Sequence, residues 1–374
     1  MRKVNLWKKC ILLIISLALI FGNANYSLAY PITFNDEATY IKATIKNNYL
    51  YDFDSNILKS NNFKNIFNNF DDYSQYYTKD ELYKILQDFN NEIVGIGIYI
   101  QKDKNNQIYV NKIIDNSPSD GKIKIGDIIY EVDNKNIKEL SLEEVADLIR
   151  GKAGTTVKLK LKDLDTNTFT VQNIKREKIK VDPLNYKIID NRVGYIQISL
   201  FSKDVNKNFE EGLKYFEDNN IGKAIIDLRG NGGGYLDETI KICRMLIGNS
   251  PIVHIKNKNY EKTYYSYLEK NRFKKENLII LVDENTASAS EILAAAIKDT
   301  RSGILVGKST YGKGTVQKLY SLPSSGSGFK LTEAMYLSPN RNIIEDKGIK
   351  PDFEIGLSSK KDEQLNLSMK LLNN

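Results

Sequence analysis

The chain has 374 residues, more than one hydrophobic core normally organises, so the sequence predicts a multidomain protein. Hydrophobic residues at 41% and charged residues at 27% are typical of globular chains and exclude wholesale disorder. The net charge is +7, but four basic residues lie within the first nine positions, and the remainder carries 50 basic against 47 acidic residues, or +3. That balance excludes a dedicated nucleic-acid binder, which would need a concentrated basic face.

The first 29 residues are typical of a secretory signal peptide. Basic residues precede an apolar run of 12 residues at 10–21, which is too short to cross a bilayer as a helix. The small residues Ser27 and Ala29 favour cleavage after Ala29. We therefore expect an exported protein that works outside the cytoplasm, either secreted or associated with the cell envelope. The alternative is an uncleaved segment that keeps the chain at a membrane.

Residues 30–90 form a segment rich in Asn, Lys and Tyr with helical periodicity. Two sets of apolar residues each fall on one helical face: Ile41, Ile45 and Tyr49, then Leu82, Ile85, Leu86 and Phe89. No residue pattern in this segment points to chemistry. We predict a helical cap or a dimerisation arm, and on that basis we expect a homodimer.

Residues 91–165 predict a small β-rich domain. Strands are expected at 93–100, where two glycines interrupt the strand, and at 107–114, 126–133 and 154–161. Ser141 and Glu144 make a capping-box pattern at the start of a helix, and that helix has an apolar stripe of Leu142, Val145, Leu148 and Ile149.

This segment resembles a PDZ domain in its order of elements and in two turns. The turns read SP followed by GKIKIGDII at 117–129, and RGKAGTTV at 150–157. The resemblance implies that a peptide is added as a strand beside the sheet and that backbone N–H groups of a glycine loop hold its free carboxylate. That loop would be Val94, Gly95, Ile96, Gly97 and Ile98. Taken alone, these residues would favour a plain strand with a bulge.

From 166 to 374, strands alternate with helices, which predicts a layered α/β core. Strands are expected at 192–198, 223–228, 277–283 and 303–307, and helices through 209–216, at 236–246 and at 288–298. Two glycine-rich stretches do not fit nucleotide binding. The phosphate-loop pattern ending at Gly307 needs a glycine at 302, which is serine, and the stretch at 230–235 ends in tyrosine.

A serine and a lysine 25 residues apart carry the candidate chemistry. Ser288 lies where a strand leads into a helix, so its hydroxyl is near the positive helix end and the N–H of Ala289 can face an oxyanion. A serine there would by default only cap the helix. Lys313 lies between two glycines in a turn poor in polar residues, and desolvation there would lower its pKa toward neutrality, as a general base requires. Gln317 lies four residues after Lys313 on an extended segment, so its side chain is expected on the same side as that of Lys313.

At these residues the chain resembles the C-terminal processing peptidases, also called tail-specific proteases. The shared motifs are DLRGNGGG at 227–234, TASASEI at 286–292 and YGKGTVQ at 311–317. The resemblance implies a core fold like that of crotonases and Clp proteases, with an inserted PDZ domain and an N-terminal helical segment. The implied domain division is 1–29, 30–90, 91–165 and 166–374.

The resemblance also implies the role of each residue. Ser288 corresponds to the nucleophile, Lys313 to the general base and Gln317 to a supporting polar residue, while the N–H groups of Ala289 and Gly233 form the oxyanion hole. Lys313 takes the proton of Ser288, and the serine attacks a peptide carbonyl. No metal or organic cofactor is required. The expected substrates are proteins with free, mostly apolar C-termini.

Two other classes of protein stay open on the sequence alone. The chain could be a peptide-binding module whose core is catalytically inactive, or a crotonase-like enzyme that transforms acyl groups. A chymotrypsin-like protease is disfavoured, because the single histidine, His254, lies in an alternating segment and we expect it to be structural.

Overall fold

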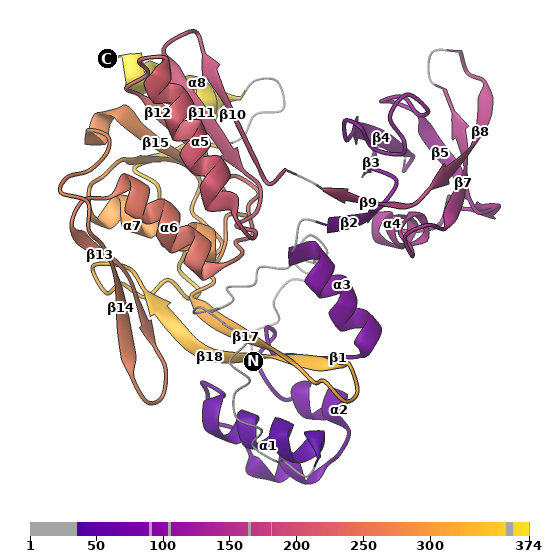
Figure 1. Ribbon diagram of the computed structural model, residues 1–374, viewed down its shortest axis with the longest axis horizontal. Helices are drawn as coiled ribbons and strands as arrows, with labels where there is room; N and C mark the ends of the chain where they lie inside the picture. The colour runs from indigo at the N-terminus through magenta and orange to yellow at the C-terminus, as the bar shows by residue number, and fades with distance from the viewer. Residues whose placement is uncertain are drawn as a thin grey trace. The chain divides into compact units, whose positions relative to one another are not determined.

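The computed structural model describes residues 36–89, 92–103, 106–163, 166–180, 182–356 and 362–373 (Figure 1). The expected signal segment lies outside the described residues. The chain forms two compact units: residues up to Tyr83 together with Pro183–Asn374, and Lys84–Asp182. The second unit is wider at both ends than the expected 91–165. Within the described part of the chain, every helix is too short or too polar to cross a membrane.

A six-stranded sheet organises the first unit, in the order β10-β11-β12-β15-β16-β19. Strand β10 (Leu184–Ile189) is antiparallel to its neighbour, and the rest are parallel: β11 (Val193–Ile198), β12 (Ala224–Asp227), β15 (Leu278–Val282), β16 (Ile304–Gly307) and β19 (Phe353–Glu354). All residues of β12 and β15 are buried. Continuously apolar parallel strands of this kind have both faces covered by other elements.

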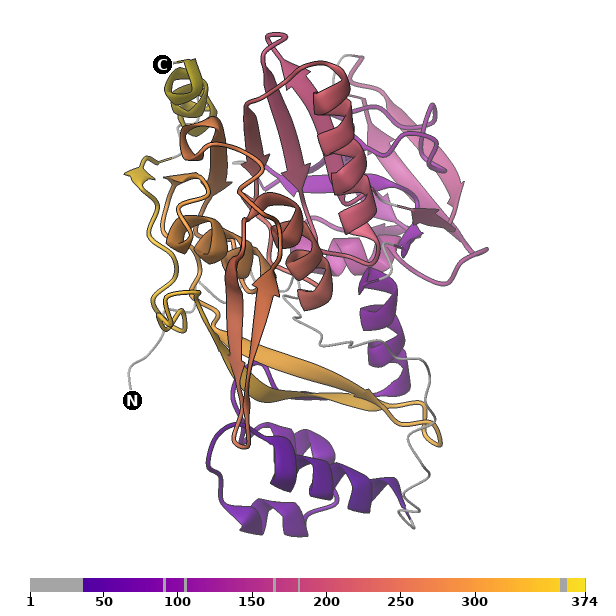
Figure 2. The same ribbon diagram turned by 60° about the vertical axis from the view of Figure 1, so that its left-hand side comes forward.

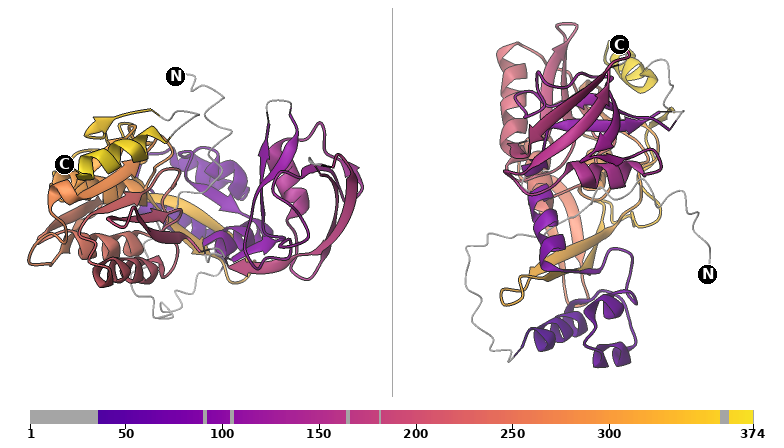
Figure 3. Two further views of the ribbon diagram at one scale, coloured as in Figure 1. Left: turned by 90° about the horizontal axis from the view of Figure 1, so that it is seen from above. Right: turned by 90° about the vertical axis from the view of Figure 1, so that its right-hand side faces the viewer.

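Helices cover both faces of this sheet (Figure 3). Residues of α5 (Val205–Asp218), α6 (Leu236–Leu246) and α7 (Ala289–Asp299) share one hydrophobic cluster with the sheet. On the other face, α8 (Glu363–Asn373) packs through Leu372 against Val193, Ile225 and Ile279. The loops that follow β12, β15 and β16 therefore meet at one edge, where α/β sheets usually bind their ligands.

The first unit also contains an antiparallel sheet built on a long hairpin (Figure 2). The hairpin strands β17 (Thr315–Ser321) and β18 (Gly328–Leu337) pair with each other, and β18 also pairs with β1 (Gln75–Tyr77) and β13 (Ser250–Lys256). Strand β14 (Glu261–Ser266) lies beyond β13, and a short 3₁₀ helix, η3 (Lys275–Asn277), precedes β15.

Short N-terminal helices pack on the hairpin through aromatic side chains. They are α1 (Glu37–Asn48), η2 (Ser55–Lys59) and α2 (Phe63–Phe67). Phe329 of the hairpin stacks on Tyr320 with ring centroids 4.7 Å apart, and Phe67 of α2 lies 5.6 Å from Phe329. The N-terminal segment is thus helical, and it also contributes the strand β1. Helix α3 (Lys79–Phe89) follows β1 and runs across the boundary between the two units.

The second unit is a β-sheet domain with one helix. Its main sheet has the order β3-β4-β5-β7-β8, with β6 paired to β5. The strands are β3 (Ile98–Lys102), β4 (Ile108–Ile113), β5 (Ile128–Val132), β6 (Lys135–Asn136), β7 (Thr156–Lys162) and β8 (Phe169–Lys175). Helix α4 (Leu142–Ile149) begins with the expected capping box between Ser141 and Glu144.

The stretch 93–100 is interrupted at its glycines, as expected, and it forms two separate strands instead of one. Strand β2 (Glu92–Gly95) pairs with β9 (Glu177–Lys180), whereas β3 begins at Ile98 and pairs with β4. Gly97 lies between them with φ +83°, a conformation that only glycine adopts at low cost. A side chain at this position would also overlap Ser117.

We expect Gly307→Ala to destabilise the first unit by about 3 kcal/mol. Gly307 has φ +138°, and an added Cβ would lie 1.9 Å from the carbonyl oxygen of Val282 on the neighbouring strand. Gly222→Ala is the matched control, since nothing lies within 4 Å of its added Cβ. Thermal unfolding followed by circular dichroism measures the stability of both variants. Equal melting temperatures would contradict the requirement for glycine at position 307.

Candidate active site

Ser288 ends the loop after β15 and begins α7. Its backbone has φ +56°, a strained value for a residue with a side chain. Gly233 of the glycine turn lies directly against it: a Cβ added to Gly233 would be 2.8 Å from the Cβ of Ser288 and 3.0 Å from the nitrogen of Ala289. Ser288 is fully buried, and among the described residues its hydroxyl has no hydrogen-bond partner.

Lys313 lies in the loop between β16 and β17, and its side chain is almost completely buried, with 1% exposed. Burial lowers the pKa of Lys313 well below its usual value, and the neighbouring ammonium of Lys330 lowers it further. The carboxylates of Glu345, Glu291 and Asp71 act in the opposite direction. The predicted desolvation of this lysine is therefore present in the structure.

The Lys313 ammonium lies over an aromatic ring from the N-terminal segment. Its Nζ is 4.6 Å from the centroid of Tyr73, which is in range for a cation–π interaction. Since the Ser288 hydroxyl has no hydrogen-bond partner, the serine and the lysine are not hydrogen-bonded to each other in this conformation. Sequence analysis missed Tyr73, because nothing in its local pattern places it beside a residue 240 positions later.

Glu291 joins the two candidate catalytic residues through their backbone N–H groups. One carboxylate oxygen accepts from the nitrogens of Ser288 and Lys313, both at 2.9 Å. The other accepts from the hydroxyl of Thr310 at 2.6 Å and from the nitrogen of Gly312 at 2.7 Å. Burial raises the pKa of Glu291 to about 7, against the opposing effect of these four donors. In the sequence this glutamate is visible only as part of the motif TASASEI at 286–292.

Tyr336 of β18 joins the same two residues through their carbonyl groups. Its hydroxyl is within hydrogen-bond distance of the carbonyl oxygen of Ser288, at 3.1 Å, and of that of Lys313. The side chain is fully buried. Glu291 and Tyr336 together therefore fix the backbones of Ser288 and Lys313 relative to each other.

Gln317 is fully buried on β17, close to the N-terminal segment. Its amide nitrogen donates to the hydroxyls of Thr315 at 3.0 Å and Thr332 at 3.2 Å. The Thr332 hydroxyl in turn donates to Asp71 at 2.9 Å. Among the described residues, the amide oxygen of Gln317 has no partner, so it is able to accept a hydrogen bond.

The glycine turn after β12 is fixed by polar contacts. Arg229 binds Asp227 and Asp362 through its guanidinium group, and the nitrogen of Gly230 donates to Asp283 at 3.0 Å. The nitrogen of Gly233, the expected oxyanion donor, donates to the side-chain oxygen of Asn231 at 2.8 Å. The structure thus brings Gly233 to Ser288, but with its N–H group engaged.

His254 lies in β13 and has structural contacts. Its two ring nitrogens are within hydrogen-bond distance of the Thr263 hydroxyl at 2.7 Å and of the Pro339 carbonyl oxygen at 3.1 Å. These contacts lie within the antiparallel sheet and its following turn.

The expected peptide-binding loop lies at the start of the main sheet of the second unit. Val94 and Gly95 end β2, Ile96 is buried, and Ile98 begins β3. Strand β3 is an edge strand, and α4 lies alongside it. An open strand edge next to a helix can accept an added peptide strand.

Comparison with known proteins agrees with this organisation. The family model described as peptidase family S41 matches residues 192–355, and that of the PDZ domain matches residues 84–162. A probable CtpA-like serine protease of Staphylococcus aureus strain N315 is 36% identical over 296 residues, which are 76% of this chain and 57% of that protein. The chain thus spans just over half the length of that relative.

The carboxy-terminal processing protease CtpA of Bacillus subtilis strain 168 is 33% identical over 316 residues, or 84% of this chain and 67% of that protein. Two solved structures show the same fold. A photosystem II D1 C-terminal processing protease has a TM-score of 0.56 at 21% identity, covering 90% of this chain and 96% of its own. A putative S41 protease from Bacteroides fragilis has a TM-score of 0.61 at 15% identity, covering 89% and 97%.

We expect Glu291→Gln to lower the free energy of unfolding by about 2–3 kcal/mol. The amide would point donor hydrogens at two of the four groups that now donate to the carboxylate, leaving buried donors unpaired. Urea unfolding measures the effect. Glu284→Gln is the control, because that side chain is half exposed and pairs with Lys308 at the surface. Equal stabilities of the two variants would contradict the assigned role of Glu291.

Proposed function

The chain belongs to peptidase family S41, and from that premise we propose that it is an exported serine endopeptidase with a Ser-Lys dyad. It would cleave protein substrates that its PDZ domain recognises by their free C-terminus. One observation carries the catalytic part of the proposal: a buried lysine with a lowered pKa is fixed through Glu291 and Tyr336 to the backbone of a strained serine.

In the proposed mechanism, neutral Lys313 takes the proton of the Ser288 hydroxyl, and the serine oxygen attacks the substrate carbonyl. Lys313 then protonates the leaving amine, and water hydrolyses the acyl-enzyme. Before the first step, the amine has to leave the face of the Tyr73 ring and approach the serine. Loss of the ammonium charge favours this movement, because a neutral amine has little cation–π attraction.

Gln317 would hold the amine in its catalytic position. Its buried amide oxygen can accept a hydrogen bond from Lys313 Nζ, and the contacts with Thr315 and Thr332 fix the amide orientation. The N–H groups of Ala289 and of the 232–233 turn would form the oxyanion hole. For the Gly233 N–H to serve, the side chain of Asn231 has to release it.

The PDZ domain would select substrates by their last residues. The loop Val94, Gly95, Ile96, Gly97 and Ile98 would hold the terminal carboxylate, and an apolar C-terminal side chain would lie between β3 and α4. The open edge of β3 and the apolar residues Ile98 and Leu142 support this proposal. Substrates are accordingly proteins and peptides with free apolar C-termini.

Further parts of the proposal rest on the sequence and on family resemblance. We propose export through the N-terminal segment, with retention at the membrane if that segment stays uncleaved, and a homodimer formed by the N-terminal helices. We also propose that the core is related to those of crotonases and Clp proteases, which its parallel sheet with helices on both faces supports. No cofactor and no nucleic acid take part.

We expect Ser288→Ala and Lys313→Ala each to reduce cleavage of an unfolded protein by at least about a thousandfold, because each removes an obligatory participant. Activity retained in either variant would refute the dyad. If the unmodified mature chain binds peptides with free C-termini but cleaves nothing, the inactive binding module is the better assignment.

We expect Lys330→Met to shift the acid limb of the kcat/KM profile to higher pH by about half a unit or more. Lys330 is a buried cation that lowers the pKa of Lys313, so its removal raises that pKa, and the base becomes neutral only at higher pH. Lys318→Met, an exposed change on the same hairpin, should leave the profile in place. An unshifted limb in Lys330→Met would contradict Lys313 as the titrating base.

A further inference from the structure

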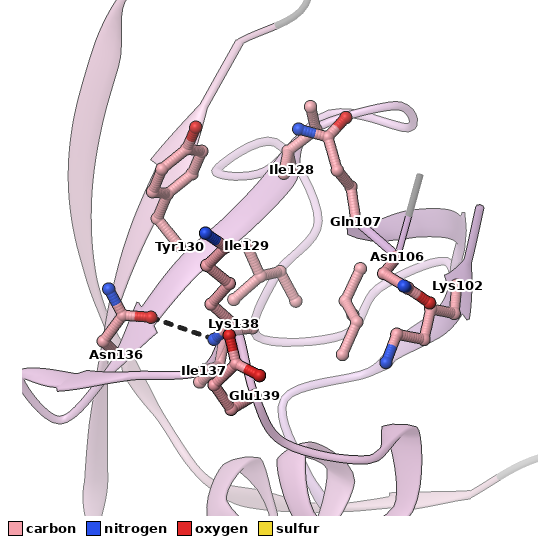
Figure 4. Close-up of a pocket in the computed structure, with 11 residues that line it drawn as sticks. Lys102, Asn106, Gln107, Ile128, Ile129, Tyr130, Asn136, Ile137, Lys138 and Glu139 are labelled. Carbon is pink, nitrogen blue, oxygen red and sulfur yellow. Dashed lines mark hydrogen bonds between the residues drawn. The ribbon is translucent and has the colours of Figure 1, made fainter. Parts of the chain in front are cut away.

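A cavity of about 390 Å³ lies in the PDZ domain at the end of β3 remote from Gly97 (Figure 4). Its apolar wall comes from Ile108, Ile129 and Ile137, which belong to the hydrophobic core of the domain. The end of β3 and the segment between β6 and α4 contribute Lys102 and Lys138. This cavity is outside the loop that is proposed to hold the terminal carboxylate.

Strand geometry places the cavity on the path of a bound peptide. Ile98, Ile100 and Lys102 alternate toward the same face of β3, and both isoleucines pack against the core of the domain. In an antiparallel peptide whose last residue lies opposite Ile98, the residue four positions earlier lies opposite Lys102. Side chains of directly opposed residues point to the same face, so that residue points toward Lys102.

The side chain of Lys102 extends from β3 toward the segment that precedes α4. Its Nζ lies 3.4 Å from the carbonyl oxygen of Leu140, just before α4, and Figure 4 shows the side chain reaching toward the segment that carries Lys138 and Glu139. The side chain of Lys102 therefore borders both the strand edge and the cavity.

The charge of the lining favours an acidic side chain. The lining contains two ammonium groups, from Lys102 and Lys138, and a single carboxylate, from Glu139. Within the described ranges, no ion pair involves any of the three. Neutral donors surround them, including the amides of Gln107 and Asn136.

We propose that this cavity is a second recognition site for substrates and that it takes an acidic side chain, preferably glutamate, four positions before the C-terminal residue. The methylene groups of the glutamate pack on the isoleucines, and its carboxylate is held between Lys102 and Lys138. The inference rests on the proposed capture of C-termini by the PDZ domain, and it adds a requirement upstream of the carboxylate. Substrates are then distinguished by more than an apolar end.

Fluorescence anisotropy with the full-length Ser288→Ala protein, which cannot consume the probe, tests the inference. The probes are labelled peptides with identical apolar C-termini that carry Glu, Gln or Lys four positions before the end, each as a free acid and as an amide. We expect the free-acid Glu peptide to bind about three- to tenfold more tightly than the Gln peptide, and the Lys peptide most weakly.

Substitutions of the two cavity lysines test whether they cause the preference for glutamate. Lys102→Met and Lys138→Met should each reduce the difference between the Glu and Gln peptides, while both variants still bind the free acids more tightly than the amides, which reports an intact domain. Lys102→Arg should keep the preference. Lys122→Met is the control, because that side chain is exposed elsewhere in the same domain and should have no effect.

The two proposals fail in different ways. If the amidated peptides bind as well as the free acids, capture of the C-terminus is wrong. If amidation abolishes binding while the Glu, Gln and Lys peptides bind equally, the carboxylate site stands and the second site is wrong. A preference for glutamate that persists in the Lys102→Met, Lys138→Met double variant would also overturn the assignment.

Discussion

The candidate active site depends on one arrangement: two buried side chains, Glu291 and Tyr336, contact the backbones of both Ser288 and Lys313, which are 25 positions apart in the sequence. Glu291 accepts from the N–H groups of both residues, and Tyr336 contacts both carbonyl groups. The amine and the hydroxyl themselves stay unconnected in this conformation. Because Glu291 and Tyr336 fix both backbones, the proposed movement of the amine from the Tyr73 ring to the serine would take place between two residues whose main chains are held in position.

Burial of Lys313 makes its charged form unfavourable, and the surrounding groups shift the balance between its neutral and charged forms. A charged ammonium without water is expensive, so desolvation favours the neutral form, and the nearby Lys330 adds to this effect. The Tyr73 ring and three carboxylates favour the charged form. The N-terminal segment supplies both Tyr73 and Asp71, so it helps to set the electrostatics of the site. Its contribution goes beyond the helical cap or dimerisation arm that its periodicity indicates.

The elements with strong local signals were predictable from the sequence, and the long-range contacts were not. The capping box at Ser141 and the helix at 236–246 are confirmed, and the motifs at Ser288 and Lys313 lead to one buried site. The two glycines indicated an interruption in the stretch 93–100, but not that its two halves pair with different strands, β9 and β4. Tyr73 and Lys330 belong to no recognised motif, and only tertiary packing brings these two residues and Tyr336 to Lys313.

Complete burial of the proposed dyad also restricts how a substrate can reach it. Ser288 and Lys313 are 0% and 1% exposed, so a peptide carbonyl can reach the hydroxyl only after a covering group moves. The polar chain from Asp71 through Thr332 to Gln317 connects the N-terminal segment to the residue that would orient the amine. A movement of the segment 71–74 would disturb both the contact of Tyr73 with Lys313 and the hydrogen bond from Thr332 to Asp71. The surroundings of the proposed base and the contacts of Gln317 are thus linked through this one segment.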